Sequence, residues 1–128
     1  MSRSIARVST AIAIQINKQV TGRTPAHYDK TMLDSALDRP VNKAHYEPKS
    51  TIAQLAGCLG TSFILNHPFP DGNKRTALGV VTEMLKQEGL KFSSQGAKEI
   101  EEAHLKVASS QMDDVGLGDV YAKHIIKA

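Results

Sequence analysis

The sequence contains no tryptophan, only three phenylalanines and three tyrosines, and one cysteine among its 128 residues. So few aromatic rings provide no platform on which the bases of a single-stranded nucleic acid could stack. The 16 lysines and arginines outweigh the 13 acidic residues by a net charge of +3, but they are spread along the chain and form no basic stripe. We therefore do not expect nucleic acid to be the partner.

Export, a membrane span and a structural metal are also not expected. The lone Cys58 cannot form an internal disulfide, and we expect it in the core of a cytoplasmic protein. No stretch approaches the 18 or so apolar residues of a membrane-spanning helix, and Gln15 and Lys18 interrupt the N-terminal apolar run before it resembles an export signal. The histidines outside the central motif lack the spacing of a zinc site, and we expect them to be surface or structural residues: His27, His45, His104 and His124.

The chain is long enough for one domain, residues 1–128, with its own core. Apolar residues recur at spacings of three and four, which predicts an all-α bundle of about six helices. We expect a helix over residues 5–20 that ends at Gly22, a short one from Asp29 to near Arg39, and a central buried one from Thr51. Further helices are expected from Gly72 to Gly89, over residues 97–112 and over residues 119–126.

Residues 39–50 lack helical periodicity and carry Pro40, Asn42 and Pro48 as breakers. They predict a loop or short exposed hairpin before the central helix, and this segment is our candidate for a recognition flap.

The chemistry is concentrated between the third and fourth expected helices, in His67-Pro-Phe-Pro-Asp-Gly-Asn-Lys-Arg-Thr-Ala77. The first turn of a helix presents unpaired N–H groups and a partial positive charge, so amides here can bind anionic oxygens. Gly72 permits close approach, Asn73 can cap the helix or donate to a phosphate, and Lys74 and Arg75 add positive charge. The residues alone predict an anion or nucleotide-phosphate site.

Two further side chains of this segment suit catalysis. Asp71 is its only carboxylate, and Mg²⁺ is commonly held by one or two carboxylates together with phosphate oxygens. Histidine has an ordinary pKa of about 6.5, which makes His67 the candidate general base, although a histidine at a helix end often has only a structural role. Phe69, between two prolines, is expected to anchor the loop in the core.

This segment resembles the signature of the Fic/Doc family in its Doc variant, and the resemblance extends to residues 33–40, Tyr46-Glu47 and residues 89–92. It implies a Fic fold and an enzyme that uses ATP and Mg²⁺. By resemblance, Asp71 binds Mg²⁺, His67 is the catalytic base, and the nucleotide phosphates are bound by Gly72, Asn73, Lys74 and Arg75. The AMP-transferring branch carries glycine where this chain has Lys74, and arginine where it has Leu78. In Doc-like proteins this change accompanies a reversed nucleotide and phosphoryl transfer.

The resemblance also implies partners. The expected substrate is a threonine of elongation factor Tu, docked by strand addition to a flap at residues 39–46, and the expected outcome is stalled translation. No inhibitory-helix pattern is found in the chain, so inhibition is expected from a Phd-type antitoxin whose disordered tail covers the site. The alternatives are a transferase that attaches AMP to a protein hydroxyl, and a catalytically silent nucleotide- or partner-binding module.

Overall fold

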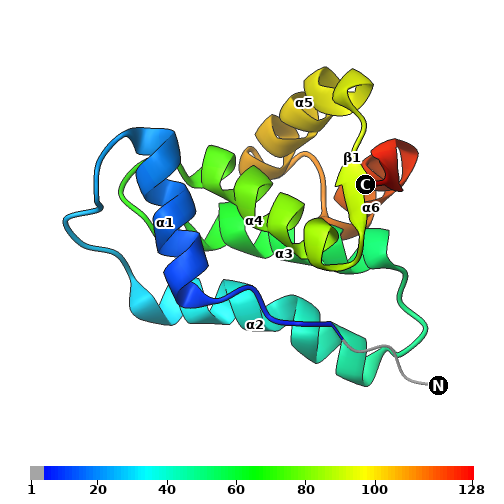
Figure 1. The fold of residues 1–128 in the computed structure, drawn as a ribbon, viewed down its shortest axis with the longest axis horizontal. Helices are drawn as coiled ribbons and strands as arrows, with labels where there is room; N and C mark the ends of the chain where they lie inside the picture. Colours follow the sequence, from blue (N-terminus) through cyan, green and yellow to red (C-terminus); the bar gives the residue numbers. More distant parts are fainter. Residues whose placement is uncertain (1–4) are drawn as a thin grey trace.

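A computed structural model describes residues 5–128, so residues 1–4 of the segment considered for an export signal lie outside it. In chain order the elements are α1 (Thr10–Thr21), α2 (Lys30–Tyr46), α3 (Ile52–Asn66), α4 (Asn73–Gln87), β1 (Leu90–Phe92), the 3-10 turn η1 (Ser94–Gly96), α5 (Ala97–Ala108), α6 (Asp114–His124) and β2 (Ile125–Lys127) (Figure 1). The prediction of an all-α fold is confirmed: between residues 5 and 128 there are six α-helices and one two-stranded antiparallel pairing, β1 with β2. No helix in this part of the chain combines the length and apolarity needed to cross a membrane.

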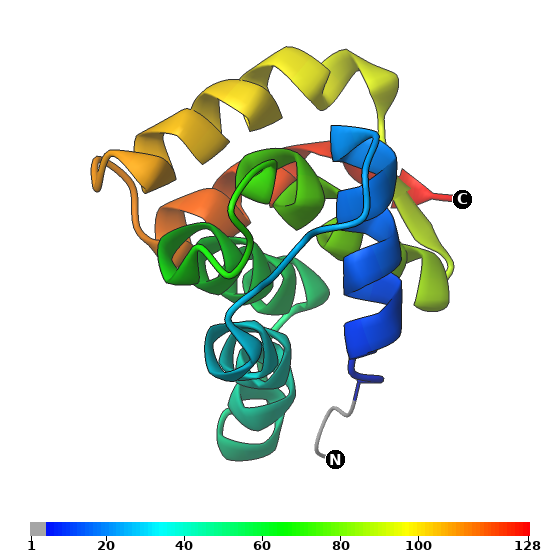
Figure 2. The ribbon, with the colours of Figure 1, turned by 90° about the vertical axis from the view of Figure 1, so that its left-hand side faces the viewer.

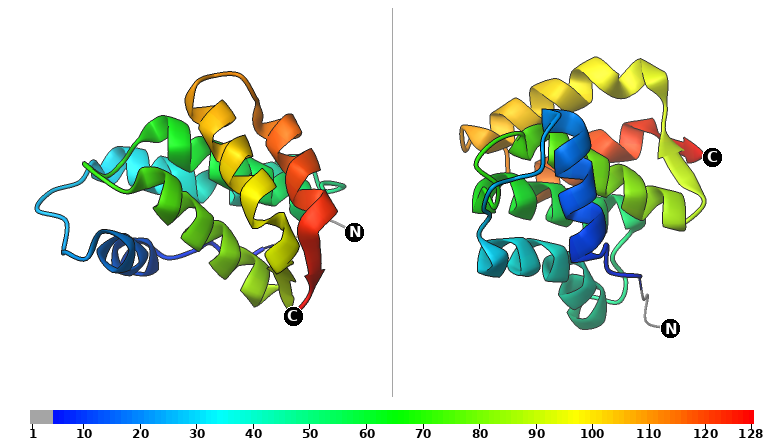
Figure 3. Two further views of the ribbon diagram at one scale, coloured as in Figure 1. Left: turned by 90° about the horizontal axis from the view of Figure 1, so that it is seen from above. Right: turned by 60° about the vertical axis from the view of Figure 1, so that its left-hand side comes forward.

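Helix α3 is the centre of the molecule, as predicted. It begins at Thr51, whose side chain accepts from the Gln54 amide while the Gln54 side chain accepts from the Thr51 amide. It packs against α2, α4, α5 and α6, and α5 and α6 lie side by side in Figure 3. At Gly57 the backbone of α3 approaches α6 so closely that a Cβ would lie 2.6 Å from the Gly118 nitrogen. The N-terminal half of α3, the helix that leads to the motif, is therefore packed tightly against α6.

The prediction of a loop over residues 39–50 is wrong for residues 39–46, because α2 continues from Lys30 through Pro40 to Tyr46. Residues 47–51 do form a short connection before α3. A proline inside a helix removes one hydrogen bond and costs about 3 kcal/mol or more in isolation. Here the buried positions keep helical spacing past the proline against α3, and this packing outweighs the penalty: Leu33, Ala36, Leu37, Pro40 and Ala44. Backbone groups already paired in a helix cannot accept an added strand, so residues 39–46 do not form a docking flap.

Other helix ends also differ from the predictions. Helix α1 begins at Thr10, capped by the Ser9 side chain, while its predicted end at Gly22 is confirmed by a left-handed cap with φ 79°. The Asp29 cap of α2 is confirmed as well. Helix α5 ends at Ala108 rather than at residue 112, and α6 starts five residues earlier than predicted, at Asp114. The bonds at these ends are local: Ser9 caps α1, Asp113 caps α6, and the turn after α5 bonds back to the last turn of that helix.

His104 on α5 and Tyr121 on α6 form a buried polar pair beneath α4. Their side chains are 4% and 0% exposed, and His104 Nε2 lies 2.5 Å from the Tyr121 hydroxyl. Burial lowers the pKa of His104 to about 4, against a smaller opposing effect of its hydrogen bond to the Lys74 backbone. Burial also raises the pKa of Tyr121. The pair is therefore neutral at neutral pH and ties α5 and α6 to the first turn of α4.

This pair predicts a pH-dependent stability. Because the folded pKa of His104 is about 4 and its ordinary value is 6.5, unfolding takes up a proton between these limits. The stabilisation is present in full above pH 6.5 and is lost as the pH falls toward 4, by up to about 3 kcal/mol. Denaturant unfolding at a series of pH values should show that the free energy of unfolding falls less between pH 6.5 and 4 in His104→Gln than in the parent. Parallel curves for the parent and the variant would contradict the assignment.

Candidate active site

The segment between α3 and α4 forms a tight loop at one end of the molecule (Figure 2). His67 ends α3 with a left-handed backbone, φ 50°, and its N–H bonds the Phe63 carbonyl at 3.2 Å. Gly72, with φ 74°, then starts α4. Left-handed non-glycine residues are uncommon, and they gather at functional sites when surrounding contacts hold them there. His67 has such a backbone conformation, and its side chain is exposed.

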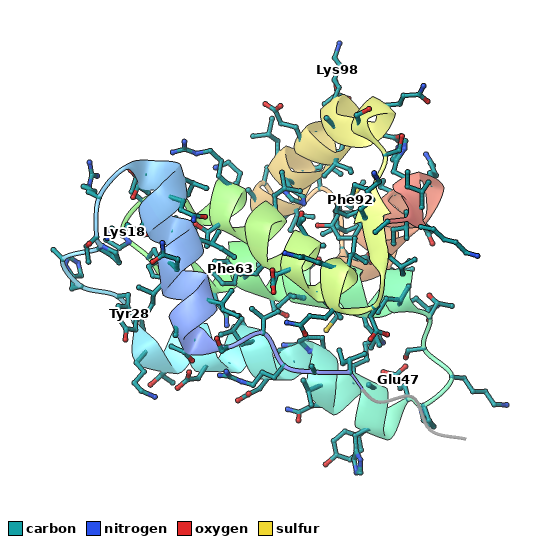
Figure 4. The ribbon with its side chains drawn as sticks, viewed as in Figure 1. Lys18, Tyr28, Glu47, Phe63, Phe92 and Lys98 are labelled. Carbon is teal, nitrogen blue, oxygen red and sulfur yellow. The ribbon has the colours of Figure 1, made fainter. Side chains whose placement is uncertain are left out.

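Phe69 anchors the loop in the core, as predicted from the sequence. Its side chain is 1% exposed. Its ring centroid lies 5.8 Å from that of Tyr28, just before α2, and 6.1 Å from that of Phe63 on α3, both of which are labelled in Figure 4. The loop before α2, helix α3 and the motif loop are thus joined through one buried ring.

The Asn73 side chain closes the loop. Its Oδ1 accepts from the Phe69 N–H at 3.0 Å, and its Nδ2 donates to the Phe69 carbonyl at 2.7 Å. The residue is 5% exposed, so these two bonds satisfy buried backbone groups. The sequence predicted that Asn73 would cap the helix or donate to phosphate. In this arrangement its side chain braces the loop, and any contact with phosphate falls to its backbone N–H.

Asn17 is a residue of the site that the sequence analysis missed. It lies on α1, is 1% exposed, and donates from Nδ2 to the Asp71 carbonyl at 2.9 Å and to Thr76 Oγ1 at 3.1 Å. A Cβ on Gly72 would lie 2.7 Å from the Thr21 methyl, so α1 also sets how close the loop can come. The one available signal was a polar residue four positions after the buried Ala13 on the same helix face.

A second loop, residues 22–29 between α1 and α2, runs beside the motif (Figure 2). The Asp29 N–H donates to the Pro68 carbonyl at 2.8 Å. Arg23 Nη2 lies 3.3 Å from Asp71 Oδ2, with both side chains more than half exposed. The segment that borders the site is therefore residues 22–29, and not the residues 39–50 predicted from the sequence.

All six predicted site residues line one cavity of about 580 Å³: His67, Asp71, Gly72, Asn73, Lys74 and Arg75. Its remaining walls come from the end of α3, the loop and α5: Ile64, Leu65, Pro70 and Ala108. We call it the motif cavity. A base, a carboxylate and two cations are thus placed around a space that can hold the phosphates of a nucleotide.

The N-terminus of α4 opens into the motif cavity without a side-chain cap. Each of four other helices starts with a side-chain oxygen that accepts from a first-turn amide: Ser9, Asp29, Thr51 and Asp113. Gly72 has no such oxygen, and the first intrahelical bond is donated by Thr76. The amides before Thr76 therefore remain for a ligand, and the helix dipole with Lys74 and Arg75 favours an anion.

Asp71 fits the binding of a divalent cation. Its carboxylate is 54% exposed and is the only one that lines the motif cavity, and a bound metal ion would replace its exposed ion pair with Arg23. Residues 5–128 contain no group of three or more His, Cys, Asp or Glu residues placed to hold a metal. A Mg²⁺ ion at Asp71 would thus take its other ligands from phosphate oxygens and water, which is the usual arrangement for Mg²⁺ with nucleotides.

The family comparison agrees with the site. The family model described as "Fic/DOC family" matches residues 7–85, from just before α1 to near the end of α4. No curated protein matches the chain. Fic/DOC proteins are transferases that act on proteins and use a nucleoside triphosphate with a metal ion. The matched segment contains the whole motif and the helices that hold it, and the chain belongs to the Fic/DOC family.

Proposed function

We propose that this chain is a Doc-like phosphotransferase that moves the γ-phosphoryl group of ATP to a serine or threonine hydroxyl of a translation factor. The observation that carries the proposal is the motif cavity, in which His67 and Asp71 face an uncapped helix N-terminus flanked by Lys74 and Arg75. The protein substrate we propose, by resemblance, is elongation factor Tu.

In the proposed reaction the target hydroxyl oxygen forms a bond to the γ-phosphorus while the bond to the β,γ-bridging oxygen breaks, and ADP leaves. His67 takes the hydroxyl proton, a role for which its exposed position in the motif cavity suits it. The α4 amides, Lys74 and Arg75 hold the phosphate oxygens, and positioning with charge stabilisation supplies most of the rate of phosphoryl transfer. Asp71 would hold Mg²⁺, which neutralises phosphate charge when bound.

Two side chains favour phosphoryl over AMP transfer. Lys74 is exposed in the first turn of α4, where the AMP-transferring branch carries glycine. Leu78 is 39% exposed on the same helix, where that branch carries an arginine. A leucine cannot clamp phosphate, so this side of α4 offers one charged fork fewer for a phosphate tail. AMP transfer remains a distinct outcome of the test below.

We further propose that the protein is the toxin of a toxin–antitoxin pair. The sequence lacks an inhibitory-helix pattern, and Lys74 and Arg75 leave positive charge exposed at the site. An acidic tail of a Phd-type antitoxin would match that charge.

Intact-protein mass spectrometry of elongation factor Tu incubated with this protein, ATP and Mg²⁺ tests the proposal. We expect the mass of one phosphate to be added by the parent and not by His67→Ala. Addition of AMP would assign the chain to the AMP-transferring branch. Nucleotide binding without any His67-dependent product, in purified factor or cell extract, would support a silent binding module instead.

A further inference from the structure

A second cavity, of about 810 Å³, adjoins the motif cavity where the end of α5 and the start of α6 face α3. Leu65 of α3 lines both cavities, and the neighbours Val107 and Ala108 at the end of α5 line one each. We call it the turn cavity, because the α5–α6 turn forms one of its walls. In Figure 2 the motif loop lies between this turn and the loop of residues 22–29, so the two approach the site from different sides.

Apolar side chains line the turn cavity on its α3 and α5 sides. Leu65 is 55% exposed and lies two positions before His67, on a helix whose residues 55–64 are all buried. Val107 and Met112 line the same cavity. An exposed leucine at the edge of a cavity gains free energy when a second apolar side chain covers it. The turn cavity therefore suits a ligand that brings an apolar side chain next to the motif.

A buried hydroxyl without a partner lies at the turn cavity. Thr61, one of its lining residues, is 9% exposed, and its Oγ1 has no hydrogen-bond partner among residues 5–128. Ser62, the next residue of α3, also lines the cavity. An unpaired buried hydroxyl costs free energy, and a polar group of a bound chain would remove that cost. The cavity thus offers hydrogen bonding as well as apolar contact.

The charged side chains of the turn cavity are two carboxylates and one cation: Asp113, Asp114 and Arg39. Asp113 is engaged, because its Oδ1 accepts from the Gly116 N–H at 2.8 Å. The guanidinium of Arg39 is hydrogen-bonded to the Cys58 thiol. The carboxylate of Asp114 is partly exposed and has no hydrogen-bond or ion-pair partner in the described part of the chain. Unlike the motif cavity, with its Lys74 and Arg75, this cavity favours a cation.

We propose that the turn cavity binds a segment of the protein substrate that carries an apolar and a basic side chain close to the hydroxyl that is modified. This inference rests on the proposed function, because it needs a protein substrate at His67. The apolar side chain packs on Leu65 and Met112, and the basic side chain lies at Asp114. The hydroxyl-bearing residue then enters the motif cavity past Leu65, so contacts with one continuous chain select which hydroxyl reaches His67.

Steady-state kinetics test this assignment on elongation factor Tu, or on the protein of a cell extract that gains the phosphate. We expect Asp114→Asn to raise the KM for the protein substrate about threefold, the loss of one exposed ion pair. Asp114→Lys should raise it about tenfold, because repulsion replaces attraction. The kcat and the dissociation constant of ATP with Mg²⁺ should stay parental. Asp119→Lys is the matched control, since Asp119 is exposed on the same helix and does not line the turn cavity.

Methyl NMR spectra of the protein locate the contact directly. The methyl signals of Val107 and Met112 should shift when the protein substrate is added and stay in place with ATP and Mg²⁺ alone. An active enzyme whose KM is unchanged in Asp114→Lys, or is raised equally in Asp119→Lys, would overturn the inference and leave the proposed function intact. Shifts that depend on the concentration of this protein alone would overturn it in favour of a second copy of the chain. If the parent transferred phosphate to no protein, the proposed function would fall and the inference with it.

Discussion

Replacing His67 with alanine is expected to slow group transfer by about 10²–10⁴-fold and to leave nucleotide affinity within a few fold of the parent. The imidazole is the one side chain of the motif cavity suited to remove the proton of the attacking hydroxyl near neutral pH. In the proposed site, nucleotide affinity would depend instead on the α4 amides, Lys74 and Arg75. Single-turnover rates at saturating ATP, with dissociation constants measured separately, check both parts of the expectation.

Two variants make this result specific. His67 has a left-handed backbone, φ 50°, and asparagine tolerates that conformation better than alanine does. His67→Asn should therefore be as slow as His67→Ala without added strain in the loop. His45→Ala removes an exposed histidine at the end of α2, outside the motif cavity, and should retain the parental rate. A His67→Asn enzyme with full activity would remove His67 from the chemistry.

Replacing Phe69 with alanine is expected to lower the free energy of unfolding by about 3–5 kcal/mol, the usual cost of deleting a buried phenylalanine. The ring is 1% exposed and contacts Tyr28 and Phe63, so its loss leaves a void where the loop before α2, helix α3 and the motif loop meet. The same ring fixes the position of the Phe69 backbone, to which the Asn73 side chain makes two hydrogen bonds. Without the ring, the motif loop should therefore also lose its conformation. Denaturant unfolding measures the first effect, and phosphate affinity the second.

Tyr46→Ala is the matched control, since that aromatic residue is 80% exposed. Its replacement should change the free energy of unfolding by no more than about 0.5 kcal/mol. Phe69→Leu separates the two consequences, because it keeps most of the buried volume and should retain both the fold and the phosphate site. A Phe69→Ala protein with parental stability would show that the loop is held by its hydrogen bonds alone.

Much of the secondary structure was predictable because its signals are local. The caps at Asp29 and Thr51 and the glycine at position 22 each act within a few residues of the helix end that they define. The motif could be recognised from the sequence for the same reason, since its candidate base, carboxylate and cations fall within nine consecutive residues, 67–75. The cavity that gathers these side chains is built from the adjacent ends of two successive helices.

The predictions were incomplete where contacts between residues far apart in the sequence decide the local structure or the burial of a side chain. Pro40 reads locally as a helix breaker, yet burial against α3 keeps the helix intact through it. His104 was expected to be a surface or structural residue, and only the packing of α5 on α6 shows that it is a structural one, buried against Tyr121. Burial depends on what lies on the other side of a residue, which periodicity does not reveal.

By itself, the sequence determined the helical class, the central position of α3 and the residues of the motif, because periodicity, caps and turn residues act over a few positions. Only the tertiary structure decided which segments border the site. Asn17 lies 54 residues from Asp71 and Arg23 lies 48 residues from it, and both reach it through the packing of α1 and the following loop on the motif. Such contacts form only when the whole core assembles, so no short stretch of sequence encodes them.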